Sequence, residues 1–236
     1  AKEFIQNNCN TLKPVQLPLQ EAVGRILAEN IYAPLDIPAY PQSSMDGYAL
    51  SFEDWKNSGE LQIFGEIAAG RGDKFQLPAG KAVRIFTGAP VPPGADTVVM
   101  QEKCRVTGDI LFIEDSLLKS GDNVRPTGSE ISTGALALEK GSLLTPAAIG
   151  FLAGIGLTTI SIYPAPVVSI IVTGNELQTP GKPLGYGQVY ESNSLTLSSA
   201  LMQASLPPPK VYRVEDQLES LAKTLEDALE NSDIVL

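Results

Sequence analysis

The sequence contains no histidine in its 236 residues. This absence removes the commonest general base and the commonest zinc and copper ligand, so any bound metal must be a hard cation held by oxygen atoms. Cysteine is also scarce: Cys9 and Cys104 lie far apart, and neither has a second cysteine or histidine at metal-ligand spacing. We therefore predict neither a zinc site nor a disulfide framework, and we expect both thiols to be reduced.

Positive charge and long apolar runs are lacking too. Lys and Arg number 17 against 27 Asp and Glu, and the net charge of −10 argues against general binding to nucleic acid or to an anionic membrane. No apolar run approaches the roughly 20 residues that span a bilayer, and the start AKEFIQNN lacks the basic and apolar regions of a signal peptide. We expect a soluble, cytoplasmic protein whose 43% hydrophobic content suffices for packed cores.

The stretch from Val167 to Leu177, VVSIIVTGNEL, changes abruptly from apolar to polar. Its β-branched first half predicts a strand covered on both faces, as in an α/β layer. Thr173, Gly174 and Glu176 follow at the carboxyl end of this strand, which is where open α/β sheets bind ligands. The alternative is that Glu176 is an ordinary solvated carboxylate in a loop.

Two further loops combine hydroxyl, carboxylate and glycine groups. The stretch QSSMDGYAL includes Ser44 and Asp46, although Asp-Gly is also a common hairpin turn. In FTGAPVPPGAD, three prolines and two glycines exclude a helix. The Thr87 hydroxyl and the amides that follow it, beginning with Gly88, suit an oxyanion, but a Thr-Gly turn without function is as common.

The chain alternates between two structural styles. Residues 19–30, behind Pro18, have apolar spacing that predicts an amphipathic helix, and residues 34–41 contain three prolines and predict an extended connector. Short β segments with glycine and proline between them then fill residues 61–124, which predicts a small barrel or sandwich. Thr145 and Pro146 next read as the start of a short helix. The β module is therefore an insertion, entered near Tyr40 and left near Arg125.

From Val167 onward, the expected order is strand, helix, strand, helix, strand. The two helices cover residues 192–204 and 217–229, and right-handed parallel crossovers make a doubly wound sheet the natural architecture. The third strand, which begins at Asp233, is not followed by a helix, so we expect a truncated domain. Asp216 precedes the second helix with Glu219 three residues later, which is the arrangement of a capping box.

Taken together, six motifs resemble the molybdopterin molybdenumtransferases, the bacterial molybdenum insertases, which are similar to the E domain of gephyrin. In order, they are SSMDGYA (43–49), VRIFTGAPVPPGADTVVMQE (83–102), GDNVRPTGSEI (121–131), LTPAAIGFLAGIG (144–156), VTGNEL (172–177) and GQVYESN (187–193). The resemblance covers essentially the whole chain. The sequence does not contain the family's next motif, a Gly-Gly-Val-Ser-Val-Gly-Asp run, or the family's C-terminal β domain.

The resemblance implies three structural parts. Residues 1–41 and 126–165 are expected to form an elongated α+β domain, residues 42–125 an inserted β-barrel, and residues 166–236 an incomplete molybdopterin-binding α/β domain of three layers with a mostly parallel sheet. The implied reaction inserts molybdenum from molybdate into adenylylated molybdopterin and releases AMP. Homodimers are implied as well, with a molybdopterin adenylyltransferase as a further partner.

The resemblance also assigns roles to residues. Asp46, Glu176 and Asp216 match catalytic positions, and Thr87 matches the threonine of the family's Thr-Gly-Ala-Pro motif. Ser44, Thr87, Gly88, Thr173 and Gly174 are expected to bind substrate. Cleavage of a phosphoanhydride benefits from a hard divalent cation, so we expect Mg²⁺ on Asp46, Glu176 and Asp216. The alternative function is a molybdopterin-binding scaffold or regulator without transferase activity.

Overall fold

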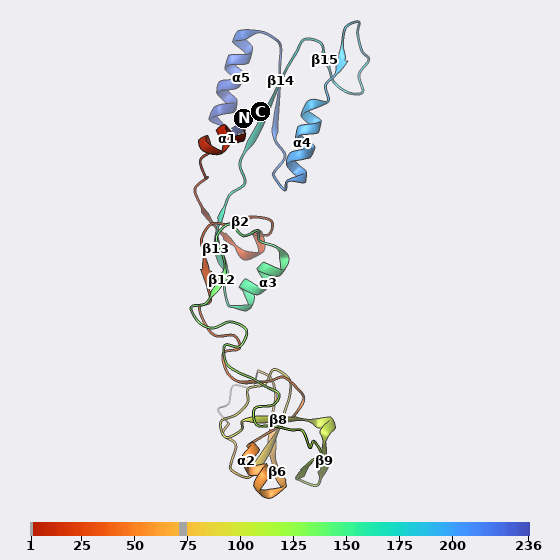
Figure 1. Ribbon diagram of the computed structural model, residues 1–236. Coiled ribbons are helices and arrows are strands. Elements are labelled where there is room, and N and C mark those ends of the chain that lie inside the picture. Colours follow the sequence, from red (N-terminus) through yellow and green to blue (C-terminus); the bar gives the residue numbers. More distant parts are fainter. Residues whose placement is uncertain (1, 71–74) are drawn as a thin grey trace. The chain divides into compact units, whose positions relative to one another are not determined.

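The computed structural model describes residues 2–70 and 75–236, which fold into two compact units (Figure 1). The first unit lies within residues 1–29, 139–153 and 157–236, and the second within residues 30–138 and 154–156. The mixed α/β architecture is as predicted. The expected three-way division at residues 41, 125 and 165 is not tested by this grouping and stays a prediction.

The second unit is built on a curled, six-stranded mixed sheet in the order β8-β5-β7-β6-β10-β9. Within this sheet, the β6–β7 pair is the only parallel one among the described strands. All of its strands except β5 match the short β segments predicted within residues 61–124. The strands of the sheet are β5 (Gly47–Leu50), β6 (Glu60–Ile67), β7 (Lys81–Ile85), β8 (Thr97–Met100), β9 (Cys104–Thr107) and β10 (Ile110–Ile113). The closed barrel that the resemblance implies stays a prediction.

Both faces of this sheet are covered, because alternate residues of its strands enter two apolar clusters. Ala49 belongs to one cluster and Leu50 to the other, and Val98 and Val99 divide in the same way. Helix α2 (Phe52–Ser58), which the sequence analysis missed, adds Phe52 to the second cluster. It begins with the Asp54 amide donating to the Ser51 hydroxyl (3.2 Å) and ends at Gly59 with φ +77°, so its two ends are those of a capped helix.

The segments that enter and leave the β module run side by side. β3 (Ile31–Tyr32) pairs antiparallel with β12 (Leu136–Leu138), and β4 (Gln42–Ser43) pairs with β11 (Val124–Arg125). Between them, the proline-rich connector forms a bridge from Ile37 to Ile131. The connector contains no helix, as predicted, but it is not extended throughout, because the backbone bends at residues 34–35 and 38–40 and only Ile37 forms a bridge.

In the first unit, β1 (Val15–Pro18) and β2 (Ile26–Leu27) flank the antiparallel strand β13 (Thr159–Tyr163). The predicted helix over residues 19–30 is wrong. Only a 3₁₀ turn forms, at Leu19–Glu21, and Gly24 takes the left-handed conformation with φ +77°. Pairing with β13 buries Leu27 completely and leaves Val23 exposed, so strand pairing overrides the helical spacing.

The short helix predicted to start at Thr145 and Pro146 is present. α3 (Pro146–Gly154) starts behind Thr145, whose hydroxyl accepts a hydrogen bond from the Ala148 amide (3.2 Å). At the amino end of the chain, α1 (Lys2–Asn8) is a second short helix that the sequence analysis did not predict.

The strand-helix-strand-helix-strand prediction for the last part of the chain is confirmed. The parallel sheet has the order β17-β14-β18, and Figure 1 shows α4 and α5 on opposite sides of β14. Outside it, β15 (Leu177–Gln178) and β16 (Val189–Tyr190) form a parallel pair. The elements of the sheet are β14 (Val168–Thr173), α4 (Asn193–Gln203), β17 (Lys210–Val214), α5 (Leu218–Glu230) and β18 (Ile234–Val235).

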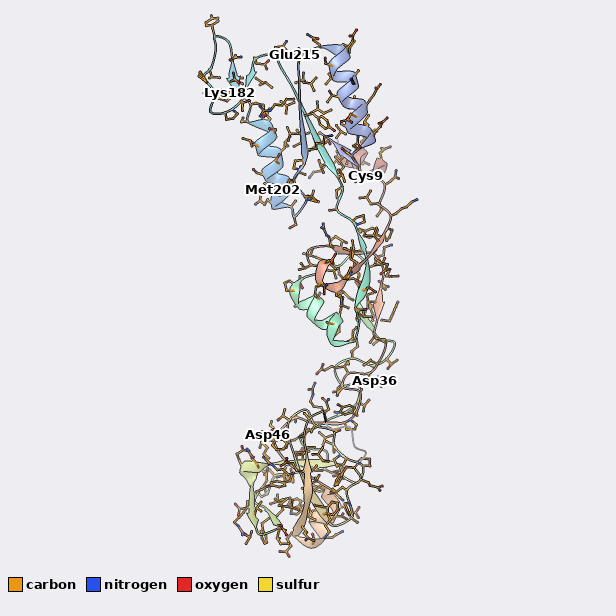
Figure 2. The ribbon with its side chains drawn as sticks, turned by 180° about the vertical axis from the view of Figure 1, so that it is seen from behind. Cys9, Asp36, Asp46, Lys182, Met202 and Glu215 are labelled. Carbon is orange, nitrogen blue, oxygen red and sulfur yellow. The ribbon has the colours of Figure 1, made fainter. Side chains whose placement is uncertain are left out.

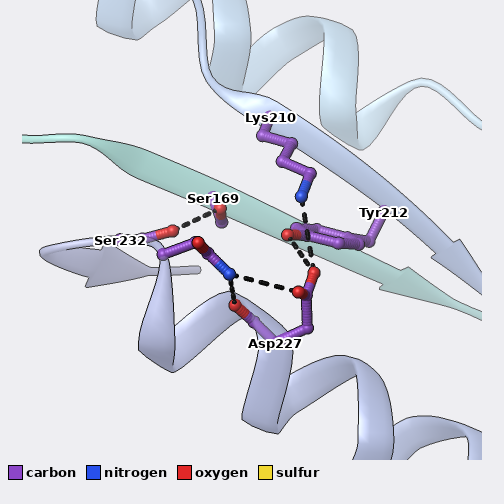
Figure 3. A network of polar contacts seen from close by, with 6 residues as sticks. Ser169, Lys210, Tyr212, Asp227 and Ser232 are labelled. Atoms are coloured by element: carbon purple, nitrogen blue, oxygen red, sulfur yellow. Dashed lines mark hydrogen bonds and ion pairs between the residues drawn. The ribbon is translucent and has the colours of Figure 1, made fainter.

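Polar contacts tie α5 to this sheet (Figure 3). The Asp227 carboxylate accepts from the Tyr212 hydroxyl (2.6 Å) and pairs with Lys210 (3.4 Å), both on β17. These two contacts lower the pKa of Asp227, with the Tyr212 hydroxyl as the larger cause. A second contact joins the hydroxyls of Ser169 on β14 and Ser232 after α5, 2.6 Å apart. The helix that follows β17 is thereby held against the sheet whose carboxyl edge carries the predicted loops.

Candidate functional site

The structure brings Asp46 and Thr87 together. β5 and β7 are neighbours with Gly47 opposite Ile85, so Asp46, just before β5, meets Thr87, just after β7. Asp46 Oδ1 accepts hydrogen bonds from the Thr87 amide (2.8 Å) and the Thr87 hydroxyl (2.8 Å). Among the residues described, none donates to the other oxygen, Oδ2. Asp46, labelled in Figure 2, therefore presents one fixed and one open carboxylate oxygen.

The backbone around Asp46 is tightly determined. Its carbonyl accepts from the Gln101 amide (3.0 Å), and a Cβ on the next residue, Gly47, would lie 1.8 Å from the Val99 carbonyl oxygen. Only glycine permits this approach of β5 to β8. Because β4 pairs with β11 and β5 with β7 and β8, the Asp46-Gly47 dipeptide is not the hairpin turn that the sequence allowed.

Ser44 and Gly88 lie in the loops beside this pair. The Ser44 hydroxyl donates to the Asn123 carbonyl (3.0 Å), and the Gly88 amide donates to the Ser43 carbonyl (2.8 Å). Gly88 has φ +80°, the left-handed region that glycine tolerates. The predicted oxyanion donors thus make internal hydrogen bonds in this structure, and substrate binding by Ser44, Thr87 and Gly88 stays a prediction.

Three residues that sequence reasoning missed surround Asp46: Arg84, Gln101 and Glu102. Arg84 donates to the Gly47 carbonyl (3.1 Å) and to the Gln101 side chain, and Gln101 donates to Glu102 (3.1 Å). They lie within the matched stretch 83–102, but only strand pairing places them near Asp46: Tyr48 pairs with Arg84 across β5 and β7, and Gly47 pairs with Met100, the residue before Gln101, across β5 and β8.

The carboxylates of this cluster favour ionisation. The Thr87 amide, then the Thr87 hydroxyl, lower the pKa of Asp46, and the charge of Arg84 adds to them. The pKa of Glu102 is lowered by its own backbone amide and by the Gln101 side chain, with Arg84 contributing and Asp46 opposing. Both carboxylates therefore keep a negative charge on the exposed surface, and the Arg84 guanidinium lowers the pKa of each.

The second group of predicted residues meets at the carboxyl edge of the parallel sheet. Thr173 ends β14 opposite Val214, which ends β17. Gly174 follows with φ +149°, and a Cβ there would lie 2.9 Å from both carboxylate oxygens of Glu176, so glycine lets Glu176 fold back over the turn. Glu176 follows β14, whose first three residues are buried, so its predicted position beyond a buried strand is confirmed. Its side chain is exposed.

Asp216 lies in the adjacent loop, where its amide donates to the side-chain oxygen of Asn175 (3.2 Å). The loops after β14 and β17 are thereby joined, and Glu176 and Asp216 share one edge of the sheet. The predicted capping box is wrong: Gln217 is the N-cap of α5, and no side chain caps the helix. Asp216 stands one residue too early, because the helix begins at Leu218 rather than at Gln217.

A cavity of about 270 Å³ opens at the same edge. Its polar lining includes Asn175, Glu191, Arg213 and Glu215, and Figure 2 labels Glu215 near the end of β17. Apolar side chains of Val172, Leu177 and Val214 complete the wall. The carboxyl ends of parallel strands are the expected place for a ligand in this architecture.

Glu191, Arg213 and Glu215 are residues of this cavity that the sequence analysis missed, and Glu191 is the buried one. It is only 3% exposed, and it accepts hydrogen bonds from the Ser194 amide (2.7 Å) and hydroxyl (2.5 Å) at the start of α4. Burial opposes its ionisation, but these bonds and the Arg213 guanidinium, 3.6 Å away, outweigh burial and lower its pKa. The sequence signal that could have identified Glu191 is its place just before the start of a predicted helix, three residues ahead of Ser194.

The predicted metal ligands belong to both units: Asp46 to the second, Glu176 and Asp216 to the first. Within residues 2–70 and 75–236, no three Asp, Glu, Cys or His side chains are grouped as metal ligands. The three-carboxylate Mg²⁺ site therefore stays a prediction. The chemistry of the donors suits it, because each side chain is an exposed carboxylate and Mg²⁺ prefers oxygen ligands.

Comparison with known proteins identifies the family of the chain. Residues 1–156 match the family model described as the MoeA N-terminal region, domains I and II. The molybdopterin molybdenumtransferase of Haemophilus influenzae is 34% identical over 220 residues, which cover 93% of this chain and 54% of that protein. That of Nostoc sp. is 39% identical over 223 residues, which cover 92% and 51%. The chain spans about half the length of these curated relatives.

The fold has a solved counterpart. The crystal structure of the molybdopterin biosynthesis moeA protein from Pyrococcus horikoshii OT3 superposes with a TM-score of 0.87 at 32% identity, covering 99% of this chain and 63% of that one. The chain belongs to the MoeA family, whose curated members are named molybdopterin molybdenumtransferases. In the described part of the chain, no helix is both long and apolar enough to cross a membrane.

Proposed function

We propose that the intact protein inserts molybdenum from molybdate into adenylylated molybdopterin and releases AMP. The observation that carries the proposal is the Asp46–Thr87 pair. An exposed carboxylate, held by one oxygen and open at the other, sits among the residues that match the family. In this reaction, dithiolene sulfurs replace oxo ligands of molybdate, and cleavage of the phosphoanhydride frees the nucleotide.

The proposal gives the carboxylates and the other site residues different roles. Asp46, Glu176 and Asp216 are the carboxylates of the reaction and would hold Mg²⁺, which when bound neutralises charge on the substrate phosphates. Ser44, Thr87 and Gly88 contact substrate from the β-rich unit, and Thr173 and Gly174 from the edge of the parallel sheet. Arg213 is the cation of the cavity at that edge, which suits an anionic substrate on an acidic protein.

The proposal includes a homodimer in the cytoplasm, supplied with substrate by a molybdopterin adenylyltransferase. Asp46 lies in one unit and Glu176 in the other, so one catalytic site can be completed by the β-rich unit of one chain and the parallel-sheet edge of its partner. Twofold symmetry would then produce two equivalent sites.

The deciding experiment is AMP release by the intact protein, measured with adenylylated molybdopterin in the presence and absence of molybdate and of Mg²⁺. The expected result is release that requires both additions. The competing function is a molybdopterin-binding scaffold or regulator. It predicts binding of the pterin without release of AMP, and that outcome would replace the proposal.

A further inference from the structure

Arg84 occupies a defined position on β7, between two aromatic rings. Its guanidinium carbon lies 5.2 Å from the centre of the Tyr48 ring and 5.1 Å from that of Phe86. Tyr48 is the cross-strand partner of Arg84, and Phe86 is two residues further along the chain. Strand geometry places all three side chains on one face of the sheet, where the guanidinium lies within cation–π distance of both rings.

The guanidinium contacts the backbone of the residue after Asp46 and the side chain of Gln101. Nη1 donates to the carbonyl of Gly47 (3.1 Å), and Nη2 donates to the side-chain oxygen of Gln101. The Gln101 amide in turn donates to the carbonyl of Asp46 (3.0 Å). Arg84 therefore links the peptide that follows Asp46 to the residue that binds the Asp46 carbonyl.

The same arginine serves the second carboxylate of the cluster. Gln101, oriented by Arg84, donates through Nε2 to Glu102 Oε1 (3.1 Å). Without a positive charge here, Asp46 and Glu102 would repel each other on the same exposed surface. Arg84 also has a planar fork of donors, which a lysine does not offer.

We propose that Arg84 is a positioning residue for Asp46, an inference that rests on the proposed function. It does not touch the substrate. By holding the Gly47 carbonyl and Gln101, it places Asp46 Oδ1 on the Thr87 amide and hydroxyl and leaves Oδ2 open for the reaction. Loss of the guanidinium removes its hold on the Gly47 carbonyl and the Gln101 side chain, so the carboxylate no longer keeps this orientation.

The first test uses chain 1–236 and the ¹H–¹⁵N spectrum. The Thr87 amide reports its hydrogen bond to Asp46. Arg84→Ala should shift this resonance to that of a weakened hydrogen bond, Arg84→Lys should shift it partway, and millimolar guanidinium should restore it in Arg84→Ala by entering the vacated space between the rings. An unchanged Thr87 amide in Arg84→Ala, or in Arg84→Lys if the alanine variant does not fold, would overturn the inference.

The matched control is Arg105→Ala. Arg105 lies in the same sheet over an aromatic ring, 4.3 Å from the centre of Phe112, and it pairs with Glu114 (3.1 Å). In the described part of the chain it makes no contact with Asp46, Thr87 or Gln101. Its replacement should leave the Thr87 resonance and the effect of guanidinium unchanged.

The second test measures AMP release by the intact protein. Arg84→Ala should lower kcat by about 10- to 100-fold with little change in KM, because a misplaced reacting group slows the chemical step more than it weakens binding. Guanidinium should recover part of kcat, and Arg105→Ala should match the wild type. Wild-type kcat in Arg84→Ala would contradict the inference, whereas an inactive wild type would contradict the proposed function, and the Thr87 amide would then decide the role of Arg84.

Discussion

Two aspartates of the second unit accept the same pair of hydrogen bonds. Asp46 Oδ1 takes the amide and hydroxyl of Thr87, and Asp36 Oδ1 takes the amide (2.7 Å) and hydroxyl (3.1 Å) of Thr133. The local geometry is shared, so it does not by itself distinguish a catalytic aspartate from a structural one. The difference lies in the neighbours, since Arg84, Gln101 and Glu102 surround Asp46 only.

The shared geometry allows a matched comparison. In Asp46→Asn and Asp36→Asn, the remaining side-chain oxygen can still accept both hydrogen bonds, so each variant should melt within about 2 °C of the wild type. Asp46→Asn should lose AMP release by about 100-fold or more, because an amide is a poor ligand for a cation and carries no charge. Asp36→Asn should stay active. Equal activity in both variants would remove Asp46 from the reaction.

Glu191 leads to a prediction on pH. Its folded-state pKa is lowered from 4.5, so its stabilising contribution is present above that value and is lost as the pH falls through the lower folded value. Glu191→Gln should reduce the free energy of unfolding at pH 7 by about 1–3 kcal/mol, the contribution of hydrogen bonds to a charged acceptor.

Urea unfolding between about pH 7 and pH 3.5 checks this prediction. The gap between wild type and Glu191→Gln should be constant near neutrality and shrink below about pH 4.5. Glu226→Gln, an exposed change on α5, serves as the control and should show no gap. A gap that widens in acid would mean that the carboxylate is destabilised in the fold.

At the scale of elements, the chain between residues 19 and 30 shows where local pattern and tertiary pairing disagree. Apolar spacing predicts a helix, yet a 3₁₀ turn and a short strand form, with Gly24 in the left-handed region. α3 is the opposite case: Gly150 lies within a helix that the sequence predicted correctly.

These two glycines should respond oppositely to alanine. No atom lies within 4 Å of a Cβ built at either position, so crowding does not decide the outcome. Gly24→Ala should destabilise the protein by about 1–2 kcal/mol because of its φ of +77°. Gly150→Ala should stabilise it by about 0.5–1 kcal/mol, since alanine favours a helix interior. Thermal unfolding measures both, and stabilisation by Gly24→Ala would support the helix instead.

At the scale of the whole molecule, the predicted catalytic carboxylates come from separate units. Asp46 belongs to the unit whose six-stranded sheet has an apolar cluster on each face. Glu176 belongs to the unit that contains the parallel sheet. In the proposed homodimer, the two units that complete one site belong to different chains.

Mixing two inactive variants of the intact protein tests this assembly. Asp46→Ala and Glu176→Ala homodimers should each be inactive, whereas a mixed dimer has one site with both defects and one with neither. After random exchange, about half of the dimers are mixed, so activity should recover to about a quarter of the wild-type value. No recovery, once exchange is verified by tagged pull-down, would place both residues within one chain.

Much of the fold was predictable from the sequence because the deciding forces are local. The β-branched run before Thr173, the prolines of 34–41 and the hydroxyl of Thr145 each restrict their own backbone, and a strand, a segment without helix and a helix start form there. Because histidine is absent and the two cysteines lack metal-ligand spacing, oxygen atoms are the expected ligands of any bound metal. Asp46, Thr87 and Glu176 were identified from motifs, without knowledge of what surrounds them.

Only the tertiary structure decided the rest. Asp46 and Thr87 are 41 residues apart, and the register of β5 against β7 makes them partners. The same register brings Arg84 close to Asp46, and the pairing of β5 with β8 brings Gln101 there. Packing at the start of α4 buries Glu191 against Arg213. Residues 19–30 form a turn and a strand because pairing with β13 buries Leu27. Contacts between residues distant in sequence carry these outcomes, and local pattern contains no information on that pairing.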